Sequence, residues 1–328
     1  MVKIIAHLPA FPNGGKLLSE WAAAKGYQII DPAGPKSLAD FTALADGAVA
    51  FAGGSVAQIP GGGWTDEFVS SIPSSVKAVC SLGAGYDGLG KMDRFKAHGL
   101  QVSNTPTGVV QATADTGLYL ILGAMRNFGR LAASLQAGNW LKGIPLAGEY
   151  DGKTLGILGL GGIGAVVRDK VEAVFDFERI QYHNRRRAAP ETEKDCKYVS
   201  FDELISTSDV ILCVLPLNPQ THHILNRDSL AKTKKGVVIV NIGRGPLIDE
   251  EALGEALESG HVGGAGLDVY ENEPIVNEKL LAAKNTLLLP HVGTHTEEAR
   301  AKMMKEMIAN LDAVIDTGKV VNLVPELR

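Results

Sequence analysis

Arg244, the acidic segment 268–274 and His291 each directly follow an apolar run, where a buried strand is expected to end. Because the carboxyl ends of parallel strands meet at one edge of an open sheet, we expect these side chains to converge. The guanidinium is a permanent planar fork that binds carboxylates, and an imidazole can hold a proton near neutral pH. The set suits proton transfer to the carbonyl oxygen of a bound 2-oxo acid. Taken singly, Arg244 could form a domain salt bridge and His291 could cap a strand.

A glycine-rich segment, residues 159–164, matches the pattern GxGxxG. It follows a strand pattern at 155–158 and opens a helical segment, which is the context that a dinucleotide fingerprint requires. Gly159 permits the tight turn, Gly161 lets the backbone approach a pyrophosphate, and Gly164 lets the helix pack on the strand. The alternative is an ordinary glycine-rich turn between strand and helix.

The strand expected at 179–183 is followed by Asn184, Arg185, Arg186 and Arg187. An NAD-binding domain normally places a carboxylate on the ribose hydroxyls about 20 residues after the glycine motif. That carboxylate is missing here, and guanidinium groups bind a 2′-phosphate that a carboxylate would repel. The segment therefore predicts NADP in preference to NAD, with NAD still open. The alternative is a solvated basic turn.

Short apolar runs alternate with amphipathic segments along the chain. The runs are apolar in succession, as in a sheet that is covered on both faces. This alternation predicts βαβ units and doubly wound parallel sheets. We expect strands at 2–8, 48–52, 76–82, 154–160, 179–183, 210–215, 237–242 and 287–289, and helices at 16–25, 202–207 and 249–259.

Two longer helices are expected at 111–136 and 294–316. The first is rich in Ala and Leu, and the second has a periodic apolar stripe and ends at Gly318. Because the glycine motif lies near the middle of the chain, we expect an inserted nucleotide domain. The C-terminal helix would then return to the first domain.

Composition excludes several other classes of protein. The formal net charge is -5, which provides no basic footprint for nucleic acid. No apolar run approaches a membrane span, and the N-terminal run is too short for a signal peptide. Cys80, Cys196 and Cys213 form no CxxC pair, so we expect reduced, buried thiols and no metal site. These features predict a cytoplasmic protein.

Several segments together resemble the D-isomer-specific 2-hydroxyacid dehydrogenase family. They are the glycine motif 159–164 and the segments 215–223, 241–245, 266–274 and 290–293. The likeness covers nearly all of 76–300, and its details are most similar to glyoxylate/hydroxypyruvate reductases and D-mandelate dehydrogenases. The resemblance implies a Rossmann cofactor domain, residues 105–293, inserted in a flavodoxin-like substrate domain, residues 1–104 and 294–328.

The resemblance also implies roles for individual residues. Arg244 would bind substrate, His291 would be the acid/base, and Glu273, rather than Glu271, would support His291. Asp268 would face the nicotinamide amide, with a strand-end cap as the alternative.

Further binding residues follow from the same resemblance. The substrate carboxylate would bind the N–H groups of Gly83 and Ala84, with a simple turn as the alternative, and Gly54 is the candidate on a facing loop. The remaining cofactor-binding candidates are Gly159, Gly161, Gly162, Ile163, Gly164, Asn184, Arg185, Arg186, Leu215, Pro216, Ile242, Gly243, Asp268, His291 and Gly293.

Motifs and resemblance together predict an NADP-preferring D-2-hydroxyacid dehydrogenase. It would reduce small 2-oxo acids, such as glyoxylate and hydroxypyruvate, with phenylglyoxylate as a further candidate. The alternative is a dinucleotide-sensing binding protein, similar to corepressors built on the same scaffold. The helix at 111–136 and the polar stretch 138–152 resemble the family's dimer arm, so we expect a homodimer.

Overall fold

The computed structural model describes residues 1–6, 12–32, 37–53 and 63–328, which form two compact units. The first unit contains Met1–Val109 and His295–Arg328, and the second contains Val110–Thr294. The boundaries predicted from the sequence, after residues 104 and 293, lie within five residues of these. That the first unit holds substrate and the second holds cofactor stays a prediction at this point.

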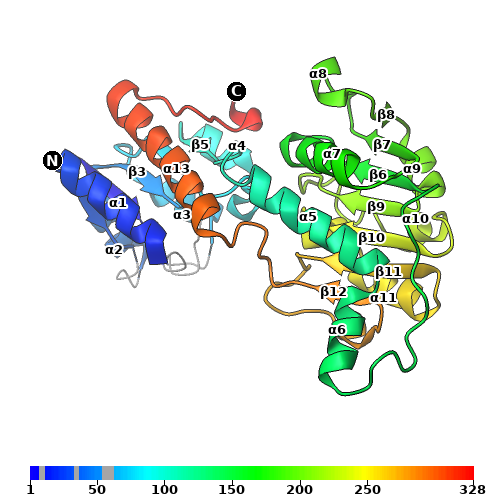
Figure 1. Cartoon of the computed structure of the whole chain (residues 1–328). Helices are drawn as coiled ribbons and strands as arrows, with labels where there is room; N and C mark the ends of the chain where they lie inside the picture. The colour runs from blue at the N-terminus through cyan, green and yellow to red at the C-terminus, as the bar shows by residue number, and fades with distance from the viewer. Residues whose placement is uncertain (7–11, 33–36, 54–62) are drawn as a thin grey trace. The chain divides into compact units, whose positions relative to one another are not determined.

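The first unit, of which Figure 1 labels β3 and β5, is built on a five-stranded parallel sheet in the order β2-β1-β3-β4-β5. This is the order of flavodoxin-like doubly wound sheets. Its strands are β1 (Lys3–Ala6), β2 (Gln28–Ile30), β3 (Ala48–Ala52), β4 (Ala78–Cys80) and β5 (Gln101–Ser103). Its helices are α1 (Pro12–Lys25), α2 (Leu38–Ala45), α3 (Asp66–Ser71), α4 (Met92–Ala97) and α13 (Glu297–Thr317).

Both faces of this sheet are covered. Met304, Met307 and Leu311 of α13 pack with Leu18 of α1 on one face. A phenylalanine-rich cluster covers the other face, with side chains from α2, α3 and α4. The unbroken apolar runs of the strands are explained by this double cover.

The second unit has a seven-stranded parallel sheet in the order β12-β11-β10-β9-β6-β7-β8. Its strands are β6 (Thr154–Leu158), β7 (Arg179–His183), β8 (Lys197–Tyr198), β9 (Val210–Cys213), β10 (Val237–Asn241), β11 (Val262–Leu267) and β12 (Thr286–Leu288). The chain runs outward in one direction from β6 and in the other from β9. Ligands of doubly wound sheets bind at such a switch point, beyond the carboxyl ends of the strands.

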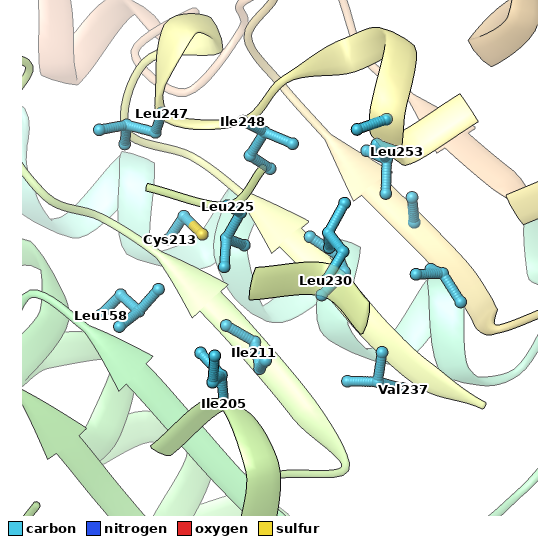
Figure 2. Packing of buried hydrophobic residues seen from close by; sticks show 14 of the residues in the cluster. Leu158, Ile205, Ile211, Cys213, Leu225, Leu230, Val237, Leu247, Ile248 and Leu253 are labelled. Carbon is cyan, nitrogen blue, oxygen red and sulfur yellow. The ribbon is translucent and has the colours of Figure 1, made fainter. Parts of the chain in front are cut away.

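Helices lie on both faces of the second sheet. They are α5 (Val110–Met125), α6 (Phe128–Gln136), α7 (Gly162–Val174), α8 (Pro190–Glu193), α9 (Phe201–Thr207), α10 (Arg227–Ala231), α11 (Glu250–Glu258) and α12 (Glu278–Ala282). On one face α5 and α7 pack through Leu120 and Val167. On the other face Ile205, Leu230 and Leu253 come from α9, α10 and α11 and belong to one buried cluster with Ile211 of β9 (Figure 2). The predicted fold class, two doubly wound parallel sheets with one domain inserted in the other, is confirmed.

One helix prediction was wrong in extent. The segment 111–136 is two helices, because Asn127 takes the left-handed conformation with φ 54° between α5 and α6. Among the described residues, no helix is long and apolar enough to cross a membrane. The three cysteines are free and buried, and burial raises the pKa of each thiol to about 12. A cytoplasmic location stays a prediction.

Candidate active site

The glycine motif forms the turn between β6 and α7. Gly159 has φ 108°, and a Cβ there would lie 2.8 Å from the Val214 carbonyl oxygen, so only glycine fits. A Cβ on Gly164 would lie 2.2 Å from the Gly159 carbonyl oxygen, which keeps the helix against the strand. A Cβ on Gly161 would meet nothing within 4 Å, so the loop is open there, beside the N-terminus of α7. This open, side-chain-free helix start fits a dinucleotide pyrophosphate.

Asn184, directly after β7, ties this turn to the neighbouring strand. Its Oδ1 accepts from the Leu160 N–H at 2.8 Å, and its Nδ2 donates to the Leu160 carbonyl at 3.3 Å. Arg185 and Arg186 follow and are exposed. Both polar atoms of the Asn184 side chain are bonded to Leu160. The positive charge that the sequence predicts for cofactor binding therefore comes from Arg185 and Arg186.

The loop after β10 carries Arg244 and is held by its own polar groups. Asn241 Oδ1 accepts from the Gly243 N–H at 3.0 Å, and Asn241 Nδ2 donates to the Arg244 carbonyl at 2.8 Å. Arg244 Nη1 donates to the Gly243 carbonyl at 2.8 Å. A Cβ on Gly243 would lie 3.1 Å from the Leu215 carbonyl, so the loop bearing Leu215 and Pro216 lies directly against this one.

Glu273 and His291 form a hydrogen-bonded pair. Glu273 Oε2 and His291 Nδ1 are 2.7 Å apart, and Glu273 Oε1 accepts from the Tyr270 N–H at 3.0 Å. Partial burial acts to raise the pKa of Glu273. Hydrogen bonds from His291 and Tyr270, with the charges of His291 and Arg244, outweigh burial and hold this pKa below its usual value. The ionised carboxylate only accepts, so Nδ1 carries a hydrogen and Nε2 points away from Glu273.

Asp268, directly after β11, fixes the loop that carries His291 through hydrogen bonds to its backbone. It is 1% exposed, and its two oxygens accept from the Val292 N–H at 2.7 Å and the Gly293 N–H at 2.9 Å. His291 itself has φ 55°, a conformation that costs a non-glycine residue about 1–3 kcal/mol. The Asp268 bonds to the next two residues offset that cost. The structure therefore gives Asp268 the capping role, and its contact with nicotinamide stays a prediction.

Gly245 brings the Arg244 loop against the Glu273 loop. A Cβ there would lie 1.8 Å from the Tyr270 carbonyl carbon and 2.4 Å from the Glu271 nitrogen. Glu250, which is 4% exposed, accepts from the Glu271 N–H at 2.8 Å. The two loops are thus in direct backbone contact, which explains why glycine follows Arg244.

A second histidine–glutamate pair was missed by sequence reasoning. His223 Nε2 bonds to Glu271 Oε1, and the His223 N–H donates to the Pro246 carbonyl at 2.8 Å. The pair joins the loop after β9 to the loops after β10 and β11. The nearest signal in the sequence was the Glu271–Glu273 doublet, which offers two carboxylates for two imidazoles.

The predicted anion-binding loop lies in the first unit. Gly83 has φ 127°, and its N–H donates to Thr105 Oγ1 at 2.7 Å. The Ala84 carbonyl accepts from Asn104 Nδ2 at 2.6 Å. The Gly83 N–H is therefore already bonded within the chain, and the Ala84 N–H stays a predicted anion donor. Gly54 lies outside the described residues.

The sheet order, the open glycine turn and the Arg244, Glu273 and His291 loops define a dinucleotide-binding protein of the doubly wound class. The family model of the D-isomer specific 2-hydroxyacid dehydrogenase NAD binding domain matches residues 118–293. The chain belongs to this family, as its motifs predicted. The second unit therefore contains the family's NAD-binding domain.

Two relatives illustrate the range of the family. The chain is 46% identical over 272 residues to "Glyoxylate reductase 1" of Saccharomyces cerevisiae, covering 81% of this chain and 77% of that protein. It is also 46% identical over 265 residues to "4-methyl-2-oxopentanoate reductase A" of Aspergillus oryzae, covering 80% and 78%.

Two solved structures are similar over the whole chain. A glyoxylate reductase from Paecilomyes thermophila has 39% identity and a TM-score of 0.90, covering 100% of this chain and 99% of that one. An NADPH-dependent glyoxylate/hydroxypyruvate reductase from Sinorhizobium meliloti, in complex with NADP and malonate, has 29% identity and a TM-score of 0.85, covering 99% and 97%.

Proposed function

We propose that the protein reduces small 2-oxo acids to D-2-hydroxy acids, with NADPH preferred to NADH. The observation that carries this proposal is the 2.7 Å bond between Glu273 and His291. It leaves Nε2 as the proton donor, on the sheet edge that also carries Arg244 and the glycine turn. No comparison supports the dinucleotide-sensing alternative.

Three residues of the chain, His291, Glu273 and Arg244, each have one task in this reaction. A bound nicotinamide cofactor supplies the hydride to the carbonyl carbon. His291 Nε2 donates the proton to the carbonyl oxygen, and Glu273 fixes the orientation of the ring and balances its charge. Arg244 binds the substrate carboxylate with its planar guanidinium, whose Nη1 donates to the Gly243 carbonyl, while Asn241 holds the backbone of the Arg244 loop.

The cofactor preference rests on the residues after β7. The open turn at Gly161 accepts the pyrophosphate, and exposed Arg185 and Arg186 supply charge for a 2′-phosphate. The Sinorhizobium meliloti relative, solved with NADP, supports the same choice. We propose NADPH as the preferred cofactor and NADH as the weaker one.

The relatives act on 2-oxo acids of different sizes. One relative at 46% identity is a reductase of glyoxylate and another of a branched 2-oxo acid, so identity alone does not choose between them. We propose glyoxylate and hydroxypyruvate, and we test the stereochemistry through the reverse reaction. With NADP⁺, D-glycerate should be oxidised and L-glycerate should not. Oxidation of L-glycerate would contradict the proposal.

We propose that the protein is a homodimer that pairs through α6 and the loop after it. This surface exposes large apolar side chains, namely Phe128 (41%), Leu135 (58%), Trp140 (71%), Leu141 (60%) and Leu146 (100%). Large apolar side chains that are exposed together on one segment are typical of interaction sites. Light scattering should give twice the chain mass, and Trp140→Ser with Leu146→Ser should give a monomer. The control Ile275→Ser, at a residue 72% exposed elsewhere, should stay dimeric. A monomeric wild type would contradict the proposal.

A further inference from the structure

The segment after β7 contains a buried charge that the proposed reaction does not use. Glu193, at the end of α8, is 8% exposed, and both of its carboxylate oxygens have partners. Arg187 Nη2 donates to Oε1 at 2.6 Å, and Arg187 Nε donates to Oε2 at 2.7 Å. The Tyr182 hydroxyl donates to Oε2 at 2.9 Å. The carboxylate is thus held in a bidentate pair and by a buried phenol.

The backbone on each side of this carboxylate is also anchored. Tyr182 is fully buried, and its oxygen accepts from the Ala188 N–H at 3.0 Å. Arg168 of α7 is 2% exposed, and its Nη1 donates to the carbonyls of Thr192 at 3.1 Å and Glu193 at 2.7 Å. The loop that carries the arginines is therefore fixed to the helix that begins at the glycine turn.

The three consecutive arginines differ in what they contact. Arg185 and Arg186 are exposed, and neither forms an ion pair with any residue that the structure describes. The guanidinium of Arg187 forms a bidentate ion pair with Glu193, which balances much of its charge. A phosphate group would gain little from a guanidinium that is neutralised in this way.

We propose that Arg187 favours NADPH indirectly, by neutralising Glu193, while Arg185 and Arg186 contact the 2′-phosphate. The inference rests on the proposed NADPH preference and assigns the task within the arginine cluster. Without Arg187, the carboxylate of Glu193 would have no cationic partner in the segment that follows Arg185 and Arg186, and its charge would repel a 2′-phosphate bound by those two arginines. NADH has no such phosphate and would be little affected. With Arg187 in place, hydrogen bonds and charge from its guanidinium hold the pKa of Glu193 below its usual value, so the two residues form an ion pair at neutral pH.

A double-mutant cycle measured by cofactor binding tests this assignment. The proteins are the wild type, Arg187→Ala, Glu193→Gln and the double variant. Dissociation constants for NADPH and NADH are measured by fluorescence titration at low salt, and circular dichroism checks folding. We expect Arg187→Ala to weaken NADPH binding about tenfold. NADH binding should change less than about threefold, and the double variant should bind NADPH within about threefold of the wild type.

Two results with the variants would overturn the inference. A double variant that binds NADPH as weakly as Arg187→Ala would show that Arg187 contacts the phosphate directly. Equal weakening of NADPH and NADH by Arg187→Ala would show that the pair only supports the loop. If Arg187→Ala does not fold, Arg187→Gln, which keeps donors but removes the charge, replaces it in the cycle.

The dissociation constants of the wild type for NADPH and NADH also test the proposed cofactor preference on its own. The wild-type ratio of the two dissociation constants reports it directly, without any variant. Equal affinity of the wild type for NADPH and NADH would refute the preference and with it the inference. A clear preference with no rescue in the double variant would refute the inference alone.

Discussion

Replacing His291 with alanine should lower kcat for 2-oxo acid reduction by about 10²–10⁴-fold, the usual contribution of a positioned proton donor. The Asp268 bonds to Val292 and Gly293 involve only backbone N–H groups and stay intact, so the loop should keep its course. The dissociation constant of NADPH should therefore change much less than kcat, even if His291 also contacts the cofactor. Stopped-flow or steady-state assays give kcat, and fluorescence titration gives the dissociation constant. A variant with wild-type kcat would contradict the assignment.

Glu273→Gln is the matched control for this prediction, because it keeps the size of the side chain and removes its charge. We expect a smaller loss of kcat than with His291→Ala. In the folded protein the pKa of Glu273 lies below its usual value of about 4.3. The ionised form, and its bond to His291, therefore persists as the pH falls through 4.3 and is lost only below it. The acid limb due to Glu273 should lie below about pH 4.3, and Glu273→Gln should lack it.

Replacing Arg185 with Asp and Arg186 with Ala should reverse the cofactor preference. The double change removes two exposed cations and adds a carboxylate, which repels a 2′-phosphate and can bond the ribose hydroxyls of NADH. Charge-assisted bonds are worth about 1.5–3 kcal/mol each, so the ratio of kcat/KM for NADPH to that for NADH should fall about 10²-fold or more. Initial rates at varied cofactor concentration measure the ratio.

The control for this variant lies on the same strand. Arg179→Asp changes an exposed arginine to a carboxylate at the start of β7, the opposite end from Arg185. It should leave the NADPH/NADH ratio unchanged within about twofold, because salt screens charges that are more than about 10 Å apart. An unchanged ratio in the Arg185 and Arg186 double variant would refute the 2′-phosphate assignment.

Strands were predictable where apolar residues run without interruption. The run at 48–52 matches β3 at both ends, and the run at 237–242 matches β10 to within one residue. The structure adds β2, β5 and β8, which contain only two or three residues and begin with Gln28, Gln101 and Lys197. A strand this short and partly polar forms because neighbouring strands pair with it, which local sequence does not reveal.

The break in the long helix had a similar cause. Residues 111–136 are rich in good helix formers, so the pattern predicted one helix. The turn at Asn127 lets α6 contact β12, where a Cβ on Gly129 would lie 3.0 Å from Leu287. This is a packing constraint between distant segments, and it outweighs local propensity.

The site was predictable in its residue types and only partly in its contacts. The choice of Glu273 over Glu271 came from a motif, and the structure indeed places Glu273 against His291. Glu271 instead meets His223, which is 48 positions away in the sequence. The pairing of Arg187 with Glu193 was also unforeseen, because a run of arginines does not reveal which one is already neutralised.

The initial rate of NADPH and NADH oxidation with glyoxylate, hydroxypyruvate and phenylglyoxylate tests the reductase function of this protein. We predict turnover with the smaller acids and a higher rate with NADPH than with NADH. The ranking of the three acids would then show the size of the substrate site. No turnover with any of them, by a protein that binds NADPH tightly, would contradict the reductase function and favour the dinucleotide-sensing role.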